Sequence, residues 1–187
     1  MLDLIRYLDN KMFYAINEYV NKNLLIDNIM IFLAEFAQYI FPLFLMILWI
    51  ANKENSRIVV LQITIAFGCT FILLKIIKFF SYRNRPFVSN FDVNQLVEHS
   101  INSSFPSNHA TSAFVIAVTV CLFYKQLGKV CLLIAFGIAF SRIWVGVHYP
   151  LDVIAGIILG TLISILFHLP FKYFTNNLII PLYFKKK

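Results

Sequence analysis

Residues 58–80 read IVVLQITIAFGCTFILLKIIKFF, an apolar run whose charged side chains, Lys75 and Lys78, come only near its end. A helix of about 20 apolar residues is long enough to cross the hydrocarbon core of a bilayer. The run therefore predicts a membrane span. The same criterion, applied outward along the chain, predicts further spans at 28–51, 109–124, 130–147 and 151–169. We expect an all-α, polytopic membrane helical bundle with about five transmembrane helices.

The composition agrees with lipid as the solvent. Of 187 residues, 60% are apolar and 13% are charged, and the mean hydropathy is +0.77, whereas soluble domains carry about 25% charged residues. A water-soluble globule is therefore excluded. Lys and Arg outnumber Asp and Glu by 16 to 9, which suits anionic headgroups or a phosphorylated substrate. We expect the membrane and a phosphorylated lipid as partners and no nucleic acid, and the sequence leaves the oligomeric state open.

The ends of the chain are less apolar than its middle. Residues 1–22 place apolar side chains at helical spacing between charges, which predicts an amphipathic helix lying on the membrane. The segment lacks the uninterrupted apolar core of a cleaved signal peptide. We treat 1–187 as one integral-membrane domain, with a transmembrane core over 28–169 and a basic tail over 170–187. Gly156 and Gly160 form a Gly-x-x-x-Gly pattern, which predicts close helix packing.

The longest polar stretch, residues 81–108, follows the 58–80 span, and a loop of this length in a compact protein is usually functional. Two complete spans separate it from the polar break at 148–150, so the two segments should lie on the same face of the membrane. Once the candidate site residues are set aside, the opposite face holds a slight excess of Lys and Arg. The positive-inside rule then places the shared face outside the cell.

Three polar clusters lie on this shared face: Lys78 with Arg85, Ser107 to His109, and Arg142 with His148 and Asp152. Snorkelling at a membrane interface could by itself account for Lys75, Lys78 or Arg83. It does not account for the histidines or for the acid. Three cations beside a helix start that carries a serine are typical of a phosphate site, because guanidinium groups and helix amides donate to phosphate oxygens.

The third cluster has the spacing of a histidine nucleophile. Pro150 suits the first position of a helix, which places Asp152 in the first turn beside His148. A carboxylate on one ring nitrogen fixes the tautomer and leaves the other nitrogen free to attack. His109, from the other loop, is then placed to protonate the leaving oxygen and later to activate water.

These residues resemble the three signature motifs of the type 2 phosphatidic acid phosphatase superfamily: Lys78-x6-Arg85-Pro86, Pro106-Ser107-x-His109 and Ser141-Arg142-x5-His148-x3-Asp152. The phrases around them further resemble the bacitracin-resistance type of undecaprenyl-diphosphate phosphatase. The resemblance implies a helical bundle and metal-independent hydrolysis through a phosphohistidine, with no cofactor. It implies His148 as nucleophile, Asp152 as its orienting partner, His109 as acid, and a phosphate site formed by Lys78, Arg85, Ser107, Asn108 and Arg142. Asn108 departs from the glycine that many members have at this position.

The expected function is hydrolysis of undecaprenyl diphosphate to undecaprenyl phosphate and inorganic phosphate, at the outer face of a bacterial cell membrane. This reaction would recycle a carrier lipid and confer bacitracin resistance. A broader lipid phosphatase, acting on phosphatidate or phosphatidylglycerol phosphate, is the alternative enzyme, because the motifs recognise phosphate rather than the lipid tail. A transporter of bacitracin or of a lipid is the alternative from another class.

Four further polar residues are weaker candidates. Asp27 and Glu35 lie in or near the first span, where an acid is either functional or held by structural hydrogen bonds. His99 belongs to the long loop and is predicted to be solvated. His168 is predicted at the opposite face.

Overall fold

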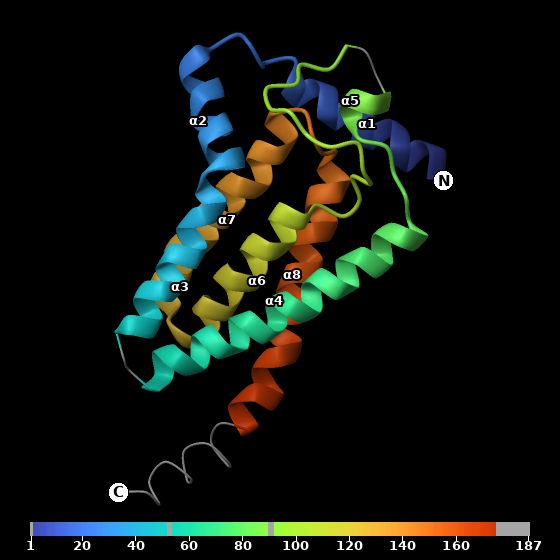
Figure 1. Cartoon of the computed structure of the whole chain (residues 1–187). Helices are drawn as coiled ribbons and strands as arrows, with labels where there is room; N and C mark the ends of the chain where they lie inside the picture. Colours follow the sequence, from blue (N-terminus) through green and yellow to red (C-terminus); the bar gives the residue numbers. More distant parts are fainter. Residues whose placement is uncertain (1, 52–53, 90–91, 175–187) are drawn as a thin grey trace, which may run out of the picture.

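A computed structural model describes residues 2–51, 54–89 and 92–174. Within these ranges every regular element is helical, which agrees with the predicted all-α class (Figure 1). In chain order the elements are α1 (Leu2–Asn17), α2 (Leu24–Glu35), the 3₁₀ turn η1 (Ala37–Tyr39), α3 (Ile40–Ile50), α4 (Glu54–Phe80), α5 (Pro86–Ser89), α6 (Asn108–Phe123), α7 (Lys125–Trp144) and α8 (Pro150–Phe174).

Three helical stretches are long and apolar enough to cross a membrane: Ser56–Phe80, Lys125–Trp144 and Pro150–Phe171. They correspond to three of the predicted spans. Helix α8 continues to Phe174, past the predicted end of this span at 169. The basic residues at the end of the predicted tail, from 175 onward, lie outside the described residues.

The predicted span at 28–51 is not one straight helix. Helices α2 and α3 meet at a bend of 41°, with η1 between them. The bend follows Glu35 and coincides with the polar interruption in this apolar run, where the Gln38 side-chain amide donates to the Glu35 carbonyl at 3.0 Å. Counted together, the bent pair would provide a fourth crossing.

Helix α6 corresponds to the predicted span at 109–124 but is short. Its 16 residues extend about 24 Å at 1.5 Å per residue, which is less than the roughly 30 Å of a hydrocarbon core. Three or four candidate spans are therefore present in the described ranges, and the count of five stays a prediction.

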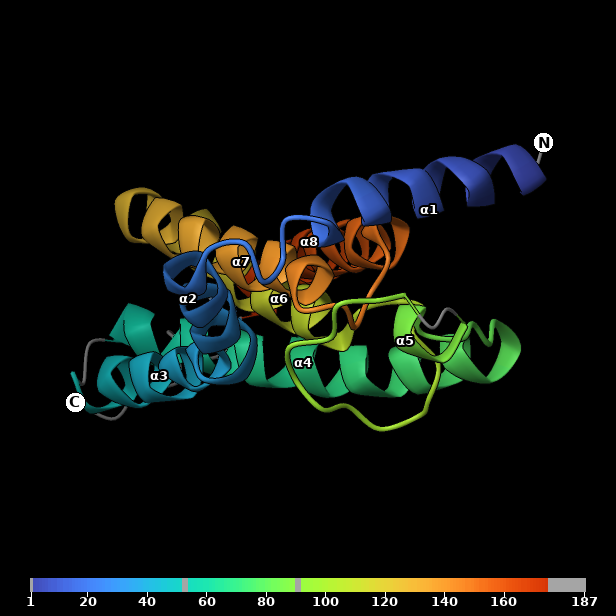
Figure 2. The same ribbon diagram turned by 90° about the horizontal axis from the view of Figure 1, so that it is seen from above.

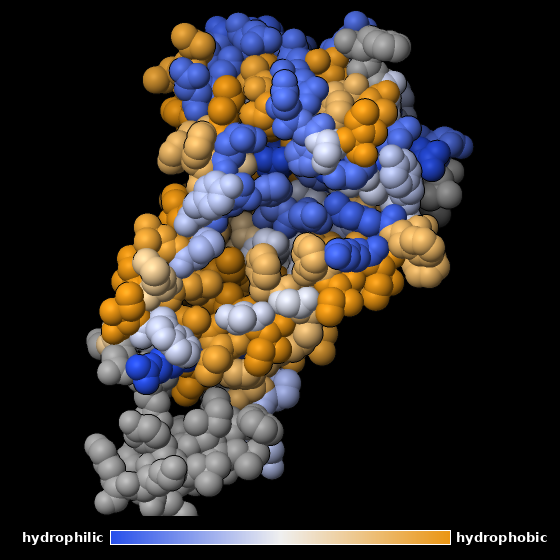
Figure 3. All heavy atoms as spheres, in the orientation of Figure 1, coloured by the Kyte–Doolittle hydropathy of each residue, from blue (hydrophilic) through white to orange (hydrophobic). Residues whose placement is uncertain are grey.

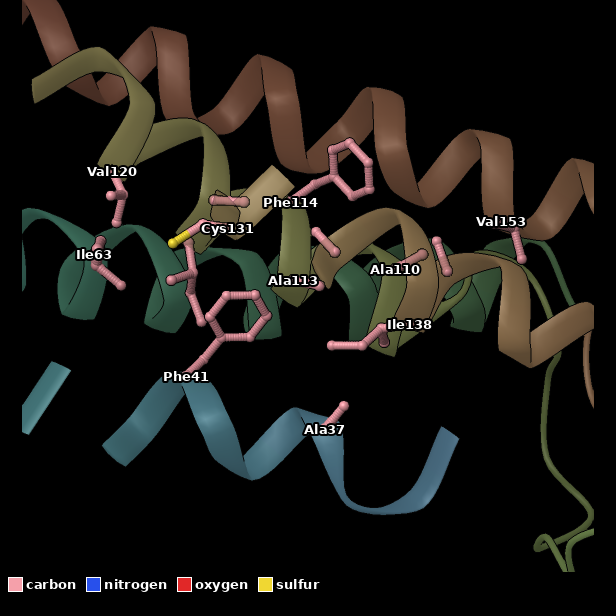
Figure 4. Close-up of a cluster of buried hydrophobic side chains, with 14 of the residues drawn as sticks. Ala37, Phe41, Ile63, Ala110, Ala113, Phe114, Val120, Cys131, Ile138 and Val153 are labelled. Atoms are coloured by element: carbon pink, nitrogen blue, oxygen red, sulfur yellow. The ribbon is translucent and has the colours of Figure 1, made fainter. Parts of the chain in front are cut away.

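Helix α6 is the centre of the bundle, packed against α4, α7 and α8. Figure 4 shows its side chains Ala110, Ala113, Phe114 and Val120 within a cluster that α3, α4, α7 and α8 complete. The packing with α8 is close, since a Cβ atom at Gly160 would lie 2.5 Å from the Thr111 carbonyl oxygen of α6. The predicted role of Gly156 and Gly160 in helix packing is confirmed.

Helix α1 lies across one end of the bundle, where it packs against α7 and α8 (Figures 1 and 2). It ends at Asn17, so the helix predicted over 1–22 is shorter than expected. Its apolar stripe is exposed, with Ile5 at 42% and Leu8 at 47% of full accessibility, while Asp9 and Phe13 are fully buried against the bundle. The helix therefore packs on the protein with a stripe that contains polar residues and leaves an apolar stripe outward.

Candidate active site

The predicted site residues lie at the end of the bundle that α1 covers. The loop over 81–107 and the turn over 145–149 meet there, as the two intervening helices require, and the Arg85 guanidinium in the loop donates to the Val147 carbonyl at 2.8 Å. Figure 3 shows hydrophilic side chains concentrated at this end and a more apolar surface below it. The two segments predicted to share a membrane face thus lie at the same end of the bundle.

His148 is placed by the turn between α7 and α8. Gly146 has a φ of +82°, and a Cβ atom there would lie 2.7 Å from the Asn94 carbonyl oxygen, so this turn requires glycine. The amides of Val147 and His148 donate back to the Arg142 carbonyl at 3.3 and 3.2 Å. The turn thus folds over the end of α7 and buries the His148 ring, which is 1% exposed.

The His148 ring lies between a cation and an acid. Its Nε2 atom is 3.2 Å from Nη1 of Arg85, and its Nδ1 atom is 3.7 Å from Oδ2 of Asp152. The second distance is too long for a hydrogen bond, and within the described residues Nδ1 has no hydrogen-bond partner. Asp152 is therefore close enough to pair with the ring but is not hydrogen-bonded to it in this structure.

The Asp152 carboxylate has two other donors. Oδ2 accepts from the backbone amide of Tyr149 at 2.9 Å, and Oδ1 accepts from Nη1 of Arg83 at 2.9 Å. Arg83 also binds Asp9 of α1 at 2.6 Å and lies over the Tyr149 ring, 4.0 Å from its centroid. The interpretation of Arg83 as a snorkelling side chain is wrong, because two buried acids, Asp9 and Asp152, hold its guanidinium in place.

The three predicted phosphate-binding cations have neutral partners. Arg85 donates to the Asn102 side-chain oxygen at 2.7 Å, Arg142 to the Ala34 carbonyl at 2.9 Å, and Lys78 to the Ser103 carbonyl at 3.1 Å. Within the described ranges none of the three forms an ion pair with a carboxylate.

Burial of these cations demands a counter-charge. Arg85 and Arg142 are 2% and 1% exposed, and the Nε atom of Arg142 has no hydrogen-bond partner among the described residues. Burial lowers the pKa of Arg85 to about 10, so the group is still protonated at neutral pH. Buried charges are normally paired, and this cluster is therefore suited to an anion.

The N-terminus of α6 lies at the same end of the bundle as these cations. Ser107 caps the helix, with its hydroxyl oxygen accepting from the Ala110 amide at 3.4 Å, and its own amide donates to the Asp152 carbonyl at 3.0 Å. Asn108 is exposed in the first turn, where helix amides lack partners within the helix. The cap and the Asp152 contact fix the start of α6 beside α8.

His109 is half-buried at the edge of an apolar cavity. The cavity has a volume of about 340 Å³ and lies between η1, α3, α4, α6 and α7. Asn108 and His109 line it together with apolar residues that include Phe41, Phe67, Phe71, Leu74, Ala113, Ile116 and Ile138. The predicted acid thus lies where a polar site and an apolar cavity meet.

His99 lies beside the candidate site, a position that the sequence prediction missed. It is half-buried rather than solvated, its ring centroid lies 6.5 Å from that of His148, and its Nδ1 atom is 3.2 Å from the Ser100 carbonyl oxygen. Burial and the nearby Arg85 lower its pKa to about 4, so the ring is neutral at pH 7. Its position in the long polar loop was the available signal, since such loops often carry function.

The weaker candidates Asp27, Glu35 and His168 lie in three different surroundings. Asp27 accepts from the indole nitrogen of Trp144 at 2.8 Å and from the Asn21 amide at 3.0 Å, so it joins α2 to α7. Glu35 is exposed. His168 lies toward the far end of the bundle, with its ring edge-on to Phe123 at 4.9 Å. Within the described part of the chain, no three His, Cys, Asp or Glu side chains are arranged to hold a metal ion.

The sequence matches the PAP2 superfamily over residues 57–176. It is 39% identical over 150 residues to the bacitracin transport permease protein BcrC of Bacillus licheniformis, covering 80% of this chain and 74% of that protein. It is 31% identical over 160 residues to the undecaprenyl-diphosphatase BcrC of Bacillus subtilis, covering 86% and 82%.

Two solved structures share the fold. Aquifex aeolicus LpxE superposes with a TM-score of 0.72 at 30% identity, covering 86% of this chain and 94% of that one. A transmembrane PAP2-type phosphatidylglycerolphosphate phosphatase from Bacillus subtilis superposes with a TM-score of 0.71 at 23% identity, covering 94% and 88%.

Proposed function

The chain belongs to the PAP2 superfamily, and on this premise we propose that it hydrolyses undecaprenyl diphosphate to undecaprenyl phosphate and inorganic phosphate. The observation that carries the proposal is a group of three cations near the buried His148 ring, Lys78, Arg85 and Arg142, which have no carboxylate partner among the residues that the structure describes. Such a group binds and neutralises a phosphate. The bundle of apolar helices and the family together indicate a multi-pass membrane protein.

In the first step His148 is the nucleophile. Burial and the cations Arg85 and Arg142 lower the pKa of its ring well below the ordinary value, so the ring is neutral and Nε2 carries a lone pair. Nε2 attacks the terminal phosphorus as the bond to the bridging oxygen breaks, and His109 gives its proton to the leaving lipid phosphate. Asp152, near Nδ1, stabilises the positive charge that the ring acquires.

In the second step water replaces the lipid. His109, now without its proton, accepts a proton from water as the water oxygen attacks the phosphorus. The bond from phosphorus to Nε2 breaks and inorganic phosphate leaves. The donors that hold the phosphate oxygens throughout are Lys78, Arg85, Ser107, Asn108 and Arg142. The proposed reaction uses side chains and water, without metal or cofactor.

The cavity beside His109 supports a lipid substrate. Its apolar lining continues from the polar site into the bundle, so a substrate with a charged head and an apolar chain fits both parts. Phosphatidate and phosphatidylglycerol phosphate have the same two parts, so a broader lipid phosphatase is the second candidate. Transport is the third, because one relative is named a bacitracin transport permease.

One assay separates these candidates. Purified protein in detergent is given undecaprenyl diphosphate, phosphatidate or phosphatidylglycerol phosphate, each with and without a chelator, and released phosphate is measured. We expect the lipid diphosphate to be the fastest substrate and the chelator to have no effect. Equal or faster turnover of a monoester lipid would favour the broader phosphatase, release abolished by the chelator would contradict metal-independent hydrolysis, and no release from any lipid would favour transport.

The proposed place of the reaction is the outer face of the bacterial cell membrane, where it would return the carrier lipid to cell-wall synthesis and confer bacitracin resistance. Cysteine labelling tests the orientation. Asn94 is a poor labelling position, since its side chain and amide bind Asn17, so we choose the exposed Glu98 in the loop and Gln126 at the opposite end. After the native cysteines are replaced, an impermeant thiol reagent should label Glu98→Cys and not Gln126→Cys in intact cells, and the reverse pattern would contradict the outward site.

A further inference from the structure

Helix α1 buries an acid against the candidate site. Asp9 is fully buried, and a buried carboxylate is costly unless it is paired and hydrogen-bonded. Its Oδ2 atom accepts from Nη2 of Arg83 at 2.6 Å, and its Oδ1 atom accepts from the backbone amide of Leu151 at 2.9 Å. Asp9 therefore contacts both an arginine of the polar loop and the first turn of α8, which carries Asp152.

Arg83 joins this acid to Asp152. Its Nη2 atom binds Asp9 and its Nη1 atom binds Oδ1 of Asp152 at 2.9 Å. The planar guanidinium presents its nitrogens in a fixed fork, and the ring of Tyr149 lies beneath it at 4.0 Å. The orientation of one carboxylate is thus coupled to the other through a single rigid group.

The coupling has an electrostatic consequence for the nucleophile. A carboxylate bound only by an arginine is strongly stabilised as an anion and is drawn toward that cation, so it interacts less with a neighbouring imidazole. A second acid on the far side of Arg83 shares the positive charge. Asp152 then keeps more of its negative potential for the Nδ1 side of His148, which lies 3.7 Å from Oδ2.

We propose that Asp9 of α1 is a positioning residue for the reaction, acting through Arg83 to hold the Asp152 carboxylate in the orientation and charge that His148 requires. This inference rests on the proposed function, since it assumes that His148 is the nucleophile. It makes α1 a component of the active site in addition to any contact that its exposed apolar stripe makes with the membrane.

The charges around His148 come from every element that surrounds it. Asp152 is the acid on α8, and the interacting groups on other elements are Lys78, Arg85, His99, His109 and Arg142. The cations among them are unchanged in an Asp9 or Arg83 variant, so a shift in the titration of His148 in those variants comes from the group of Asp9, Arg83 and Asp152. Comparison of the single variants with the double variant then isolates the coupling through Arg83.

The test is the pH profile of kcat/KM for Asp9→Asn, Arg83→Gln and the double variant. Asp9→Asn leaves the charge of Arg83 to Asp152 alone, which lowers the pKa of His148 and should move the acid limb of the profile to lower pH, with kcat reduced by about 10- to 100-fold. Arg83→Gln removes the competing cation and should move the limb to higher pH. Because Asp9 acts through Arg83, the double variant should keep the limb position of Arg83→Gln.

Asp3→Asn is the matched control, because it removes the same charge from the exposed side of the same helix and should leave rate and profile unchanged. An acid limb that does not move in Asp9→Asn, or moves in the same direction in Arg83→Gln, would overturn the inference. If Asp9→Asn does not fold, Arg83→Gln decides alone: an upward shift supports the coupling and any other result contradicts it.

Wild-type protein and His148→Ala are included so that failure of the proposed function can be told apart from failure of the role of Asp9. An inactive wild type, or an active His148→Ala, would remove the proposed function. An active wild type and an inactive His148→Ala, together with an Asp9→Asn enzyme that matches wild type, would remove only the role of Asp9.

Discussion

Arg83 and Arg85 lie two residues apart in the segment that follows α4, yet their surroundings are opposite. Arg83 binds two buried carboxylates, Asp9 and Asp152. Arg85 is more deeply buried, and its partners in the described part of the chain are the neutral groups of Asn102, Val147 and His148. The comparison indicates that Arg83 is already neutralised by the protein, whereas Arg85 requires an anion from outside it.

The largest effects are expected at His148, which lies between Asp152, the acid bound by Arg83, and Arg85. His148→Ala should lower kcat by at least about 10⁴-fold, because no other group is placed to accept the phosphoryl group. Asp152→Asn should lower it by orders of magnitude, by analogy with amidation of a triad carboxylate. Single-turnover phosphate release with folded protein measures both, and near-wild-type rates in His148→Ala would refute the mechanism.

The two arginines should respond differently to substitution. Arg85→Gln should reduce kcat/KM by about 10²- to 10³-fold and weaken inhibition by inorganic phosphate, because it removes a donor to the substrate. Arg83→Gln should leave phosphate inhibition within about twofold of wild type, because this residue is not expected to touch the phosphate. Equal loss of phosphate inhibition in both variants would show that pairing with acids does not distinguish them.

The acid His109 should matter less when the leaving group needs no proton. His109→Gln should slow hydrolysis of a lipid diphosphate by about 10²- to 10⁴-fold, but it should slow formation of the phosphoenzyme much less with an aryl phosphate whose phenol is acidic. Rapid-quench measurement of that first step with the two substrates tests this. An equal loss with both would remove His109 from the role of acid in the first step.

The unpaired cations also predict the pH dependence. Burial and then these cations depress the pKa of His148, so the neutral, nucleophilic ring persists as pH falls through the ordinary histidine range near 6.5. The acid limb of kcat/KM for the wild-type enzyme should therefore lie below that range. A limb at or above pH 6.5 would mean that a counter-charge already compensates the cations in the free enzyme.

Much of this arrangement follows from the sequence, because it depends on short motifs and on span order. The apolar runs predicted α4, α6, α7 and α8, and the two spans between 81–108 and 148–150 predicted that the motifs meet. The positions of Arg83 and His99 beside Asp152 and His148 could not be found in this way. They depend on how α1 docks and on the path of an irregular loop, and neither leaves a periodic signal in the chain.

The bend in the first predicted span was visible only as a polar interruption. Glu35 and Gln38 broke the apolar run, but hydropathy over a long window averages such residues with their neighbours. The bend also involves residues far away in the sequence, since Arg142 of α7 binds the Ala34 carbonyl near the end of α2. Contacts of this kind are tertiary and lie beyond the reach of a local pattern.

The smallest expected effect lies outside the site, at the Trp144 bond to Asp27. Trp144→Phe leaves a buried acceptor without this donor and should lower stability by about 1–3 kcal/mol while kcat/KM stays unchanged. Trp49→Phe, at an exposed tryptophan, is the control. Thermal unfolding in detergent measures both, and equal melting temperatures would show that the Asp27 bond does not stabilise α2 on α7.

We propose that Lys78, Arg85 and Arg142 hold a phosphoryl group that is bonded to His148. Trapping the phosphorylated enzyme is the most direct test. Enzyme is mixed briefly with undecaprenyl diphosphate labelled in its terminal phosphate, quenched in alkali, and digested for mass spectrometry. We expect an alkali-stable, acid-labile phosphate on the peptide that contains His148, absent in His148→Ala and strongly reduced in Arg85→Gln. Turnover with the label on another residue, or rapid single-turnover release with no labelled protein, would contradict it.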